Sequence, residues 1–266
     1  MKKYIVSNIL ILISIFSFGQ IKEIERLNVM AENYYIDKIG NYYFKIGNSI
    51  TKTNQQLDTI AIYDKKSFGK ISYIDVSNPF VNLVFYKEIN QLIFLDNYLS
   101  PLRTPVLLDD LELYNVDVVC CSEQGGFWVF DAQNSRVCLI NNNLQKIQEG
   151  SNLYRFVAKS NVKFICESNN YILLLFDNSQ IIILDKFGNY YKNINIDSID
   201  NSKLLTNLND NLYYLNNDKL IIHNIKTNEE KQITVPDYNY RDFKIFGNNL
   251  YFLTEKELII CKFDND

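Results

Sequence analysis

The stretch from Asn170 to Asp185, NYILLLFDNSQIIILD, contains two apolar runs separated by a polar turn. The first run extends from Tyr171 to Leu175 and the second from Ile181 to Leu184, and neither alternates with polar residues. Continuous apolar runs of this length are typical of strands buried on both faces, whereas a half-buried strand alternates. The stretch therefore predicts a hairpin of two fully buried strands.

The same unit occurs six times along the chain. Successive starts are 41, 44, 44, 41 and 38 residues apart, close to the roughly 40–50 residues of a four-stranded propeller blade. We therefore expect an all-β fold, a six-bladed β-propeller of four-stranded antiparallel blades. A β-sandwich or two small barrels would also be built of short strands and turns, but the even spacing without a linker favours the propeller. The six units start at Asn41, Asn82, Gly126, Asn170, Asn211 and Asn249.

Closure of the ring requires a strand from the other end of the chain. The sixth unit ends at Cys261-Lys262-Phe263, one strand short of a blade. We expect the segment from about Lys22 to Val29 to complete this blade, so that residues 20–266 form a single domain. Apolar residues three positions apart leave a helical turn open as an alternative for this segment; they are Ile21, Ile24 and Leu27.

Residues 1–19 have the features of a cleaved signal peptide. Lys2 and Lys3 precede an apolar run, and the small residues of Ser17-Phe18-Gly19 predict cleavage before Gln20. A membrane anchor is the weaker interpretation, because the run is shorter than the roughly 20 residues that span a bilayer. No cysteine lies near the junction. We therefore expect an exported protein, periplasmic or secreted, with neither a lipid anchor nor a stable membrane insertion after cleavage.

The net charge argues against one class of function, and the number of cysteines limits how they can pair. A formal charge of −4 argues against a nucleic-acid binder, which normally has a basic stripe. Five cysteines are an odd number, so in an exported chain at least one is unpaired or pairs with another molecule. Adjacent Cys120 and Cys121 on a strand would point to opposite faces. We expect most of the five to be small buried hydrophobes, with a Cys121–Cys166 bridge between neighbouring blades as an open alternative.

One part of the second unit resembles a known group of proteins. Its residues are Ile74-Asp75-Val76-Ser77-Asn78-Pro79-Phe80, followed by Leu83-Val84-Phe85-Tyr86 and Leu95-Asp96. They are similar to exported proteins of flavobacteria and their relatives, a group predicted to be β-propellers without an assigned activity. The resemblance implies a propeller and an exported protein, and it brings no catalytic residue with it.

Candidate residues for catalysis or metal binding are few. His223 is the only histidine, so neither a Ser-His-Asp triad nor a multi-histidine metal site can be built. The pair Asp109-Asp110 could bind calcium in a loop, although a solvated acidic turn explains it more simply. Trp128 is expected in the core, with an indole N–H that needs a partner. We expect no catalytic residue, no metal and no cofactor.

Binding is then the simplest use of such a ring. The loops that connect the blades carry Tyr and Arg, residue types enriched at binding hot spots. Aromatic residues scattered through a Tyr-rich protein, with nineteen Tyr, are the alternative explanation. The site that we predict consists of Tyr154, Arg155, Tyr240 and Arg241. We expect a non-enzymatic interaction or scaffold protein of the periplasm or cell envelope that binds a protein partner through this face. The alternative is a ligand-binding or lyase-type propeller with a polar or metal-dependent central pocket.

Overall fold

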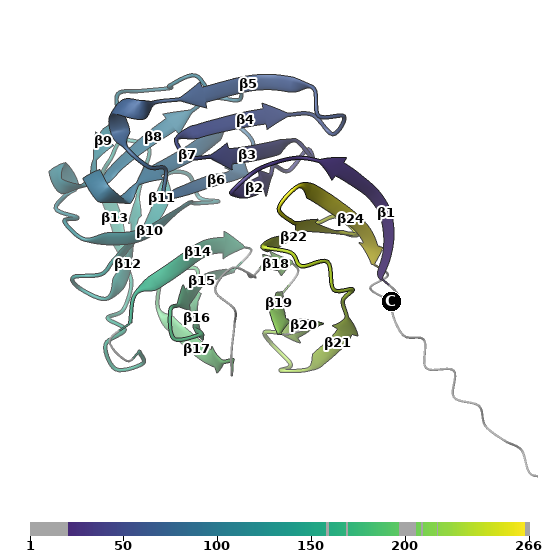
Figure 1. The fold of residues 1–266 in the computed structure, drawn as a ribbon. Coiled ribbons are helices and arrows are strands. Elements are labelled where there is room, and N and C mark those ends of the chain that lie inside the picture. Colours follow the sequence, from purple (N-terminus) through teal and green to yellow (C-terminus); the bar gives the residue numbers. More distant parts are fainter. Residues whose placement is uncertain are drawn as a thin grey trace, which may run out of the picture.

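Six four-stranded antiparallel sheets stand around an axis in the computed structural model (Figure 1). The structure describes residues 21–263 apart from 158, 159, 169, 197–205, 209 and 217. The predicted six-bladed propeller is confirmed, with each sheet forming one blade. The predicted signal peptide and its cleavage site lie outside the described residues.

The strands of the first three blades follow one another along the chain, with the innermost strand of each blade first. Blade 1 consists of β2 (Asn33–Ile36), β3 (Tyr42–Ile46), β4 (Ser49–Thr53) and β5 (Thr59–Asp64). Blade 2 consists of β6 (Tyr73–Asn78), β7 (Val81–Tyr86), β8 (Gln91–Leu95) and β9 (Val106–Leu107). Blade 3 consists of β10 (Val116–Cys121), β11 (Phe127–Asp131), β12 (Arg136–Ile140) and β13 (Lys146–Glu149).

Blades 4 and 5 have the same strand order, and blade 6 takes its outermost strand from the N-terminal side of the chain. Blade 4 consists of β14 (Val162–Ser168), β15 (Tyr171–Phe176), β16 (Gln180–Asp185) and β17 (Tyr190–Asn195). Blade 5 consists of β18 (Thr206–Leu208), β19 (Asn211–Asn216), β20 (Lys219–Asn224) and β21 (Glu230–Thr234). Blade 6 consists of β22 (Asp242–Phe246), β23 (Asn249–Leu253), β24 (Glu257–Phe263) and β1 (Ile21–Asn28). Short 3-10 helices occupy three of the loops: η1 (Lys66–Phe68), η2 (Lys87–Ile89) and η3 (Leu108–Leu111).

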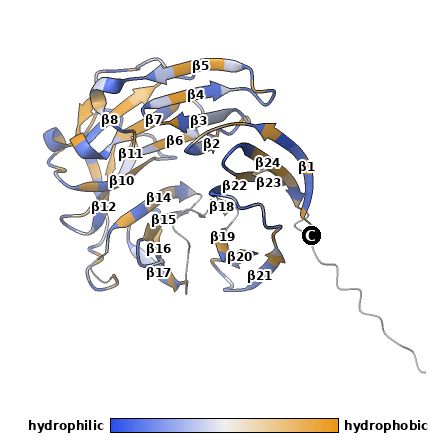
Figure 2. Cartoon of the chain, viewed as in Figure 1, coloured by the Kyte–Doolittle hydropathy of each residue, from blue (hydrophilic) through white to orange (hydrophobic). Residues whose placement is uncertain are grey.

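The hydrophobic core is divided into six clusters, one between each pair of neighbouring blades. Successive side chains of a strand point to opposite faces of the sheet. In β15, Ile172 and Leu174 pack against blade 3, while Leu173 and Leu175 pack against blade 5. Both faces of the middle strands are thus buried, which explains why their apolar runs are continuous. Figure 2 shows the hydrophobic residues concentrated on the strands.

Strand β1 closes the ring by pairing antiparallel with β24, from Ile21 opposite Phe263 to Asn28 opposite Glu257. The expected closure is confirmed, and the helical alternative for this segment is wrong. The unpaired backbone groups of β24 account for this, because they offer β1 strand partners along its length, with one irregularity between Glu23 and Glu25. Most of β1 is exposed, and Arg26 pairs with Glu23 at 2.7 Å and with Glu257 at 3.0 Å.

Alternating connections give the ring two different faces. The connections between blades and the turns between second and third strands lie on one face, which we call the connection face. The turns between first and second strands and between third and fourth strands lie on the opposite face, which we call the turn face. This division follows from the antiparallel order of the four strands in every blade.

The third strand of blades 1 to 5 ends in the same kind of turn. An Asn or Asp side-chain oxygen accepts hydrogen bonds from two backbone N–H groups that follow it, as Asn141 does from Asn143 at 3.0 Å and from Gln145 at 2.9 Å. Such a side chain replaces backbone hydrogen bonds and fixes the turn. The five residues are Asn54, Asp96, Asn141, Asp185 and Asn224.

Removal of β1 tests the closure. We expect a chain lacking residues 21–28 to melt at a clearly lower temperature and to aggregate, because β24 then exposes an unpaired edge. Arg26→Ala is the control: it removes the exposed ion pairs of β1 but keeps the strand, and it should change the melting temperature little. A deletion that melted like the intact chain would contradict closure by β1.

Asn141→Ala tests the side-chain turns. Loss of its two hydrogen bonds to backbone N–H groups should lower the free energy of unfolding by about 1–2 kcal/mol. The matched control is Asn143→Ala, which truncates an exposed side chain of the same turn. The two variants are compared by urea denaturation, and equal midpoints would show that the Asn141 side chain does not hold the turn.

Candidate functional site

The innermost strands surround a cavity of about 470 Å³ at the axis of the ring. Three aromatic side chains lie in it. The rings of Tyr35 and Tyr73 are 6.1 Å apart and edge-on, and those of Tyr73 and Phe164 are also 6.1 Å apart. Tyr73 belongs to blade 2 and Phe164 to blade 4, which are not neighbours in the ring. These two rings therefore meet at the axis itself, where they narrow the channel.

The carboxylates along this cavity already have partners. Asp75 accepts hydrogen bonds from the backbone N–H groups of Ser77 at 2.7 Å and Cys121 at 2.8 Å. The second of these joins the innermost strands of blades 2 and 3. Asp242 pairs with Lys244 at 2.9 Å, and burial raises the pKa of Asp242 against the effect of that lysine. Asp75 thus connects two blades, and Asp242 is held by a lysine of its own strand.

Glu167 lies where the cavity opens toward the turn face. Burial raises the pKa of its carboxyl, although the backbone N–H of Glu123 donates a hydrogen bond to it at 2.6 Å. The Ser122 hydroxyl and the Trp128 indole lie close to the same carboxyl. Trp128 is in the core as predicted, completely buried, and its N–H lies near Glu167 without completing a hydrogen bond. Glu167 thus anchors the blade 3 turn to blade 4.

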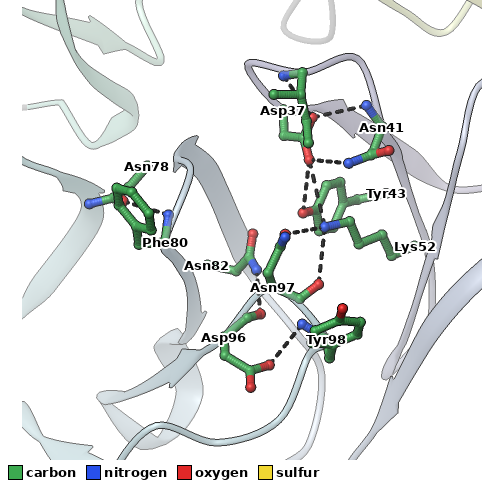
Figure 3. Close-up of polar contacts among 11 residues, drawn as sticks. Asp37, Asn41, Tyr43, Lys52, Asn78, Phe80, Asn82, Asp96, Asn97 and Tyr98 are labelled. Carbon is green, nitrogen blue, oxygen red and sulfur yellow. Dashed lines mark hydrogen bonds and ion pairs between the residues drawn. The ribbon is translucent and has the colours of Figure 1, made fainter.

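A second polar cluster joins blades 1 and 2 near the turn face (Figure 3). Lys52, almost fully buried, lies 3.7 Å from Asp37 and donates hydrogen bonds to the backbone and side-chain oxygens of Asn97. Its ammonium also lies 5.0 Å from the centre of the Tyr43 ring. Burial lowers the pKa of Lys52, and Asp37 opposes this shift. The cluster connects two blades and leaves no free nucleophile or base.

Metal ligands do not gather in the part of the chain that the structure describes. No group of three or more His, Cys, Asp or Glu side chains there is placed to hold an ion. His223 is buried on β20, with Nδ1 3.0 Å from a carboxylate oxygen of Glu230. In the acidic pair that was considered for calcium, Asp109 accepts a hydrogen bond from the Asn90 amide at 2.5 Å. None of the helices in the described ranges is long and apolar enough to cross a membrane.

All five cysteines are free thiols, and four of them are buried. The bridge considered between Cys121 and Cys166 is absent. The reason is that these side chains point into different interfaces: Cys121 lies in the cluster between blades 2 and 3, and Cys166 packs against the cluster between blades 4 and 5.

The four residues predicted to bind a partner lie on two separate connections. Tyr154 and Arg155 are exposed on the connection between blades 3 and 4, where the Tyr154 hydroxyl donates to the Gln133 carbonyl at 2.6 Å. Tyr240 and Arg241 lie on the connection between blades 5 and 6. The Tyr240 ring packs 5.1 Å from that of Phe252, and Arg241 pairs with Glu255 at 3.0 Å. Blades 4 and 5 lie between the two pairs, so the structure does not bring all four together.

Packing on the ring accounts for the apolar residues beside Tyr154. Leu153 is fully buried between blades 3 and 4, and Val157 packs against the same cluster. Phe156 stacks on Tyr190 with a centroid distance of 3.7 Å. Their apolar character therefore reflects the fold and does not by itself require a partner.

The turn face carries exposed aromatic residues that were not among the predicted contact residues. Phe80 is 79% exposed and Tyr98 is 72% exposed. Each follows an Asx residue by two positions, Asn78 and Asp96, whose side-chain oxygen accepts its backbone N–H (Figure 3). The signal in the sequence was an aromatic residue inside an Asn- or Asp-capped turn, where a buried side chain is not expected.

Solved structures with a similar fold differ in activity. Virginiamycin B lyase from Staphylococcus aureus matches with a TM-score of 0.62 and 13% identity, over 92% of this chain and 99% of the lyase. A second similar structure is that of a catalytically inactive histidine-to-alanine variant of the same lyase, with quinupristin. The Pan2 WD40 domain of Neurospora crassa matches with a TM-score of 0.60 and 8% identity, over 94% and 97% of the two chains.

BamB from Moraxella catarrhalis matches with a TM-score of 0.51 and 9% identity, over 92% of this chain and all of BamB. No protein-family model and no curated protein matches the sequence. At these identities the structural matches establish the propeller fold and leave the activity open.

Glu167→Gln tests the burial of the Glu167 carboxyl. Since the folded-state pKa is raised, the contribution of Glu167 to stability is fully present below its unfolded pKa, about 4.3, and is lost as pH rises through the folded value. Glutamine cannot ionise, so the variant escapes this loss. We expect its melting temperature to exceed that of the wild type at pH 8, and the difference to shrink toward pH 4.

The control for the loss of one charge is Glu88→Gln, at an exposed carboxyl. A Glu167→Gln variant whose melting temperature fell relative to that of the wild type as the pH rose would contradict the raised pKa of Glu167.

Proposed function

We propose that this protein is a non-enzymatic binding module of the cell envelope that is exported and binds a protein partner through its connection face. The contact of Tyr73 with Phe164 is the observation that carries the proposal. It places aromatic rings at the axis, where a propeller with a central catalytic pocket would hold its reacting groups. A rigid ring whose axial cavity is narrowed by aromatic rings is suited to binding a partner on its loops.

The histidine weighs against the lyase alternative. In Staphylococcus aureus virginiamycin B lyase, a histidine-to-alanine variant is inactive. The present chain has one histidine, His223. It lies on the third strand of blade 5, away from the innermost strands that line the axis, and is buried beside Glu230. It is therefore not available to a substrate in the central cavity.

The connection face offers apolar contact area for a partner. Five large hydrophobic side chains are exposed at this face, four in its loops and one at the end of β3, and exposed apolar groups can contribute to interaction surfaces. Tyr154 and Arg155 lie among them and are the residues that we place at the contact. Arg241 stands farther along the same face, while half-buried Tyr240 supports its loop. The five are Met30, Ile46, Ile89, Tyr114 and Tyr154.

Capture of the partner from the envelope fraction tests this function. The tagged mature protein should retain a partner that the double variant Tyr154→Ala/Arg155→Ala loses, because truncating a hot-spot residue costs about 2 kcal/mol or more, roughly thirtyfold in affinity. Arg241→Ala should have a smaller effect, since this residue already pairs with Glu255.

Folding of each variant is checked by its melting temperature. A folded double variant that retains the same partner with unchanged affinity would contradict a contact at Tyr154 and Arg155. Recovery of the protein only from the cytoplasm, with Met1 intact, would contradict export.

A further inference from the structure

The turn face carries a groove between blades 2, 3 and 4. Two hollows of about 560 and 620 Å³ share the residues Asn78, Phe80, Cys121 and Gly125 and therefore adjoin each other; we call the two together the turn groove. Its outer end lies over blades 2 and 3, and its inner end reaches Glu167 beside the axis. The groove lies on the face opposite Tyr154 and is separate from the proposed contact.

An apolar ridge stands in the middle of this groove. Pairing of Asn78 with Val81 leaves Pro79 and Phe80 as a two-residue turn. The Asn78 side chain accepts the Phe80 N–H at 2.9 Å, and the proline ring restricts the backbone. Phe80 is therefore held in solvent, although the burial of such a side chain is favourable by about 1.5–3 kcal/mol of free energy. Half-exposed Leu102 extends the apolar surface at the outer end.

The walls of the groove are already ordered. Asn141 fixes the turn at the outer end through two backbone N–H groups, and Ser122 accepts the Gln124 N–H in the turn beside Gly125. Glu167 holds the N–H of Glu123 in that same turn. A preformed groove avoids the entropic cost of ordering loops on binding, which suits it to a flexible ligand that must itself become ordered.

Charges at the two ends differ in sign. Arg103 lines the outer end, where its guanidinium donates to the Asn142 carbonyl at 3.1 Å and lies 5.6 Å from the Phe94 ring centre. No carboxylate of the described residues pairs with it. At the inner end, Glu123 and Glu167 outnumber Lys38.

We propose that the turn groove binds an extended peptide segment of a partner protein, with a carboxylate at Arg103, apolar side chains against Phe80 and Leu102, and a basic side chain at the inner end. Charge complementarity selects this occupant: a guanidinium fork matches a carboxylate, and the apolar centre excludes a uniformly charged ligand. The proposal does not depend on the contact at Tyr154 and Arg155.

A charge-swap experiment with synthetic peptides tests the proposal. The probes are two capped hexapeptides, Lys-Gly-Leu-Phe-Gly-Asp and the same peptide with Lys in place of Asp, titrated calorimetrically into the mature protein. The wild type should bind the Asp peptide at least about tenfold more tightly than the Lys peptide, because like charges at a contact are disfavoured. Arg103→Glu should reverse this preference, which mere unfolding cannot do.

Two further variants locate the site. Phe80→Ser should weaken both peptides severalfold or more through the loss of apolar contact. Tyr154→Ala/Arg155→Ala should leave both affinities unchanged, so this proposal and the proposed function can fail separately. Equal binding of the two peptides by the wild type, no detectable binding of either, or full binding by Phe80→Ser would each overturn the proposal.

Discussion

Every blade of this protein depends on its neighbours, because its sheet is apolar on both faces. A single four-stranded sheet of this kind would expose the side chains that β15 divides between two interfaces. Burial is complete only when each sheet has a partner on both sides, which a closed ring provides. Closure therefore stabilises all six interfaces. β1 provides it mainly through backbone pairing with β24, since most of its own side chains are exposed.

The same constraint determines how polar groups are used inside the ring. Buried charges need partners in a low-dielectric interior, and for Asp75 and Lys52 these partners come from the next blade. Asp75 of blade 2 accepts the Cys121 N–H of blade 3, and Lys52 of blade 1 donates to Asn97 of blade 2. Each contact fixes one blade relative to another. Asp75 and Lys52 thus have structural roles.

The two faces are built differently. On the turn face, Asx side chains such as Asn78 and Asn141 hold the turns and present Phe80 beside an ordered groove. On the connection face, longer loops pack their own apolar residues onto the ring, as Leu153 and Phe156 do, while Tyr154 and Arg155 remain exposed. The two proposed surfaces lie on opposite faces of the ring, so a partner on one would leave the other accessible.

The amino-acid sequence by itself determined the repeat, the strand type and the number of blades, because continuous apolar runs and their spacing are local properties, visible in Asn170–Asp185. It also indicated the closing strand, although the spacing of Ile24 and its neighbours was compatible with a helical turn as well. The pairing of this segment with the edge of β24 makes it a strand. Only the tertiary structure decided which blade each side chain faces. Cys121 and Cys166 lie in different interfaces, and Leu153 is buried. The four predicted contact residues lie on two connections, and Tyr73 contacts Phe164 across the axis. The physical reason is that such partners are set by the order of blades around the ring, and no local pattern encodes a contact between blades far apart in the chain.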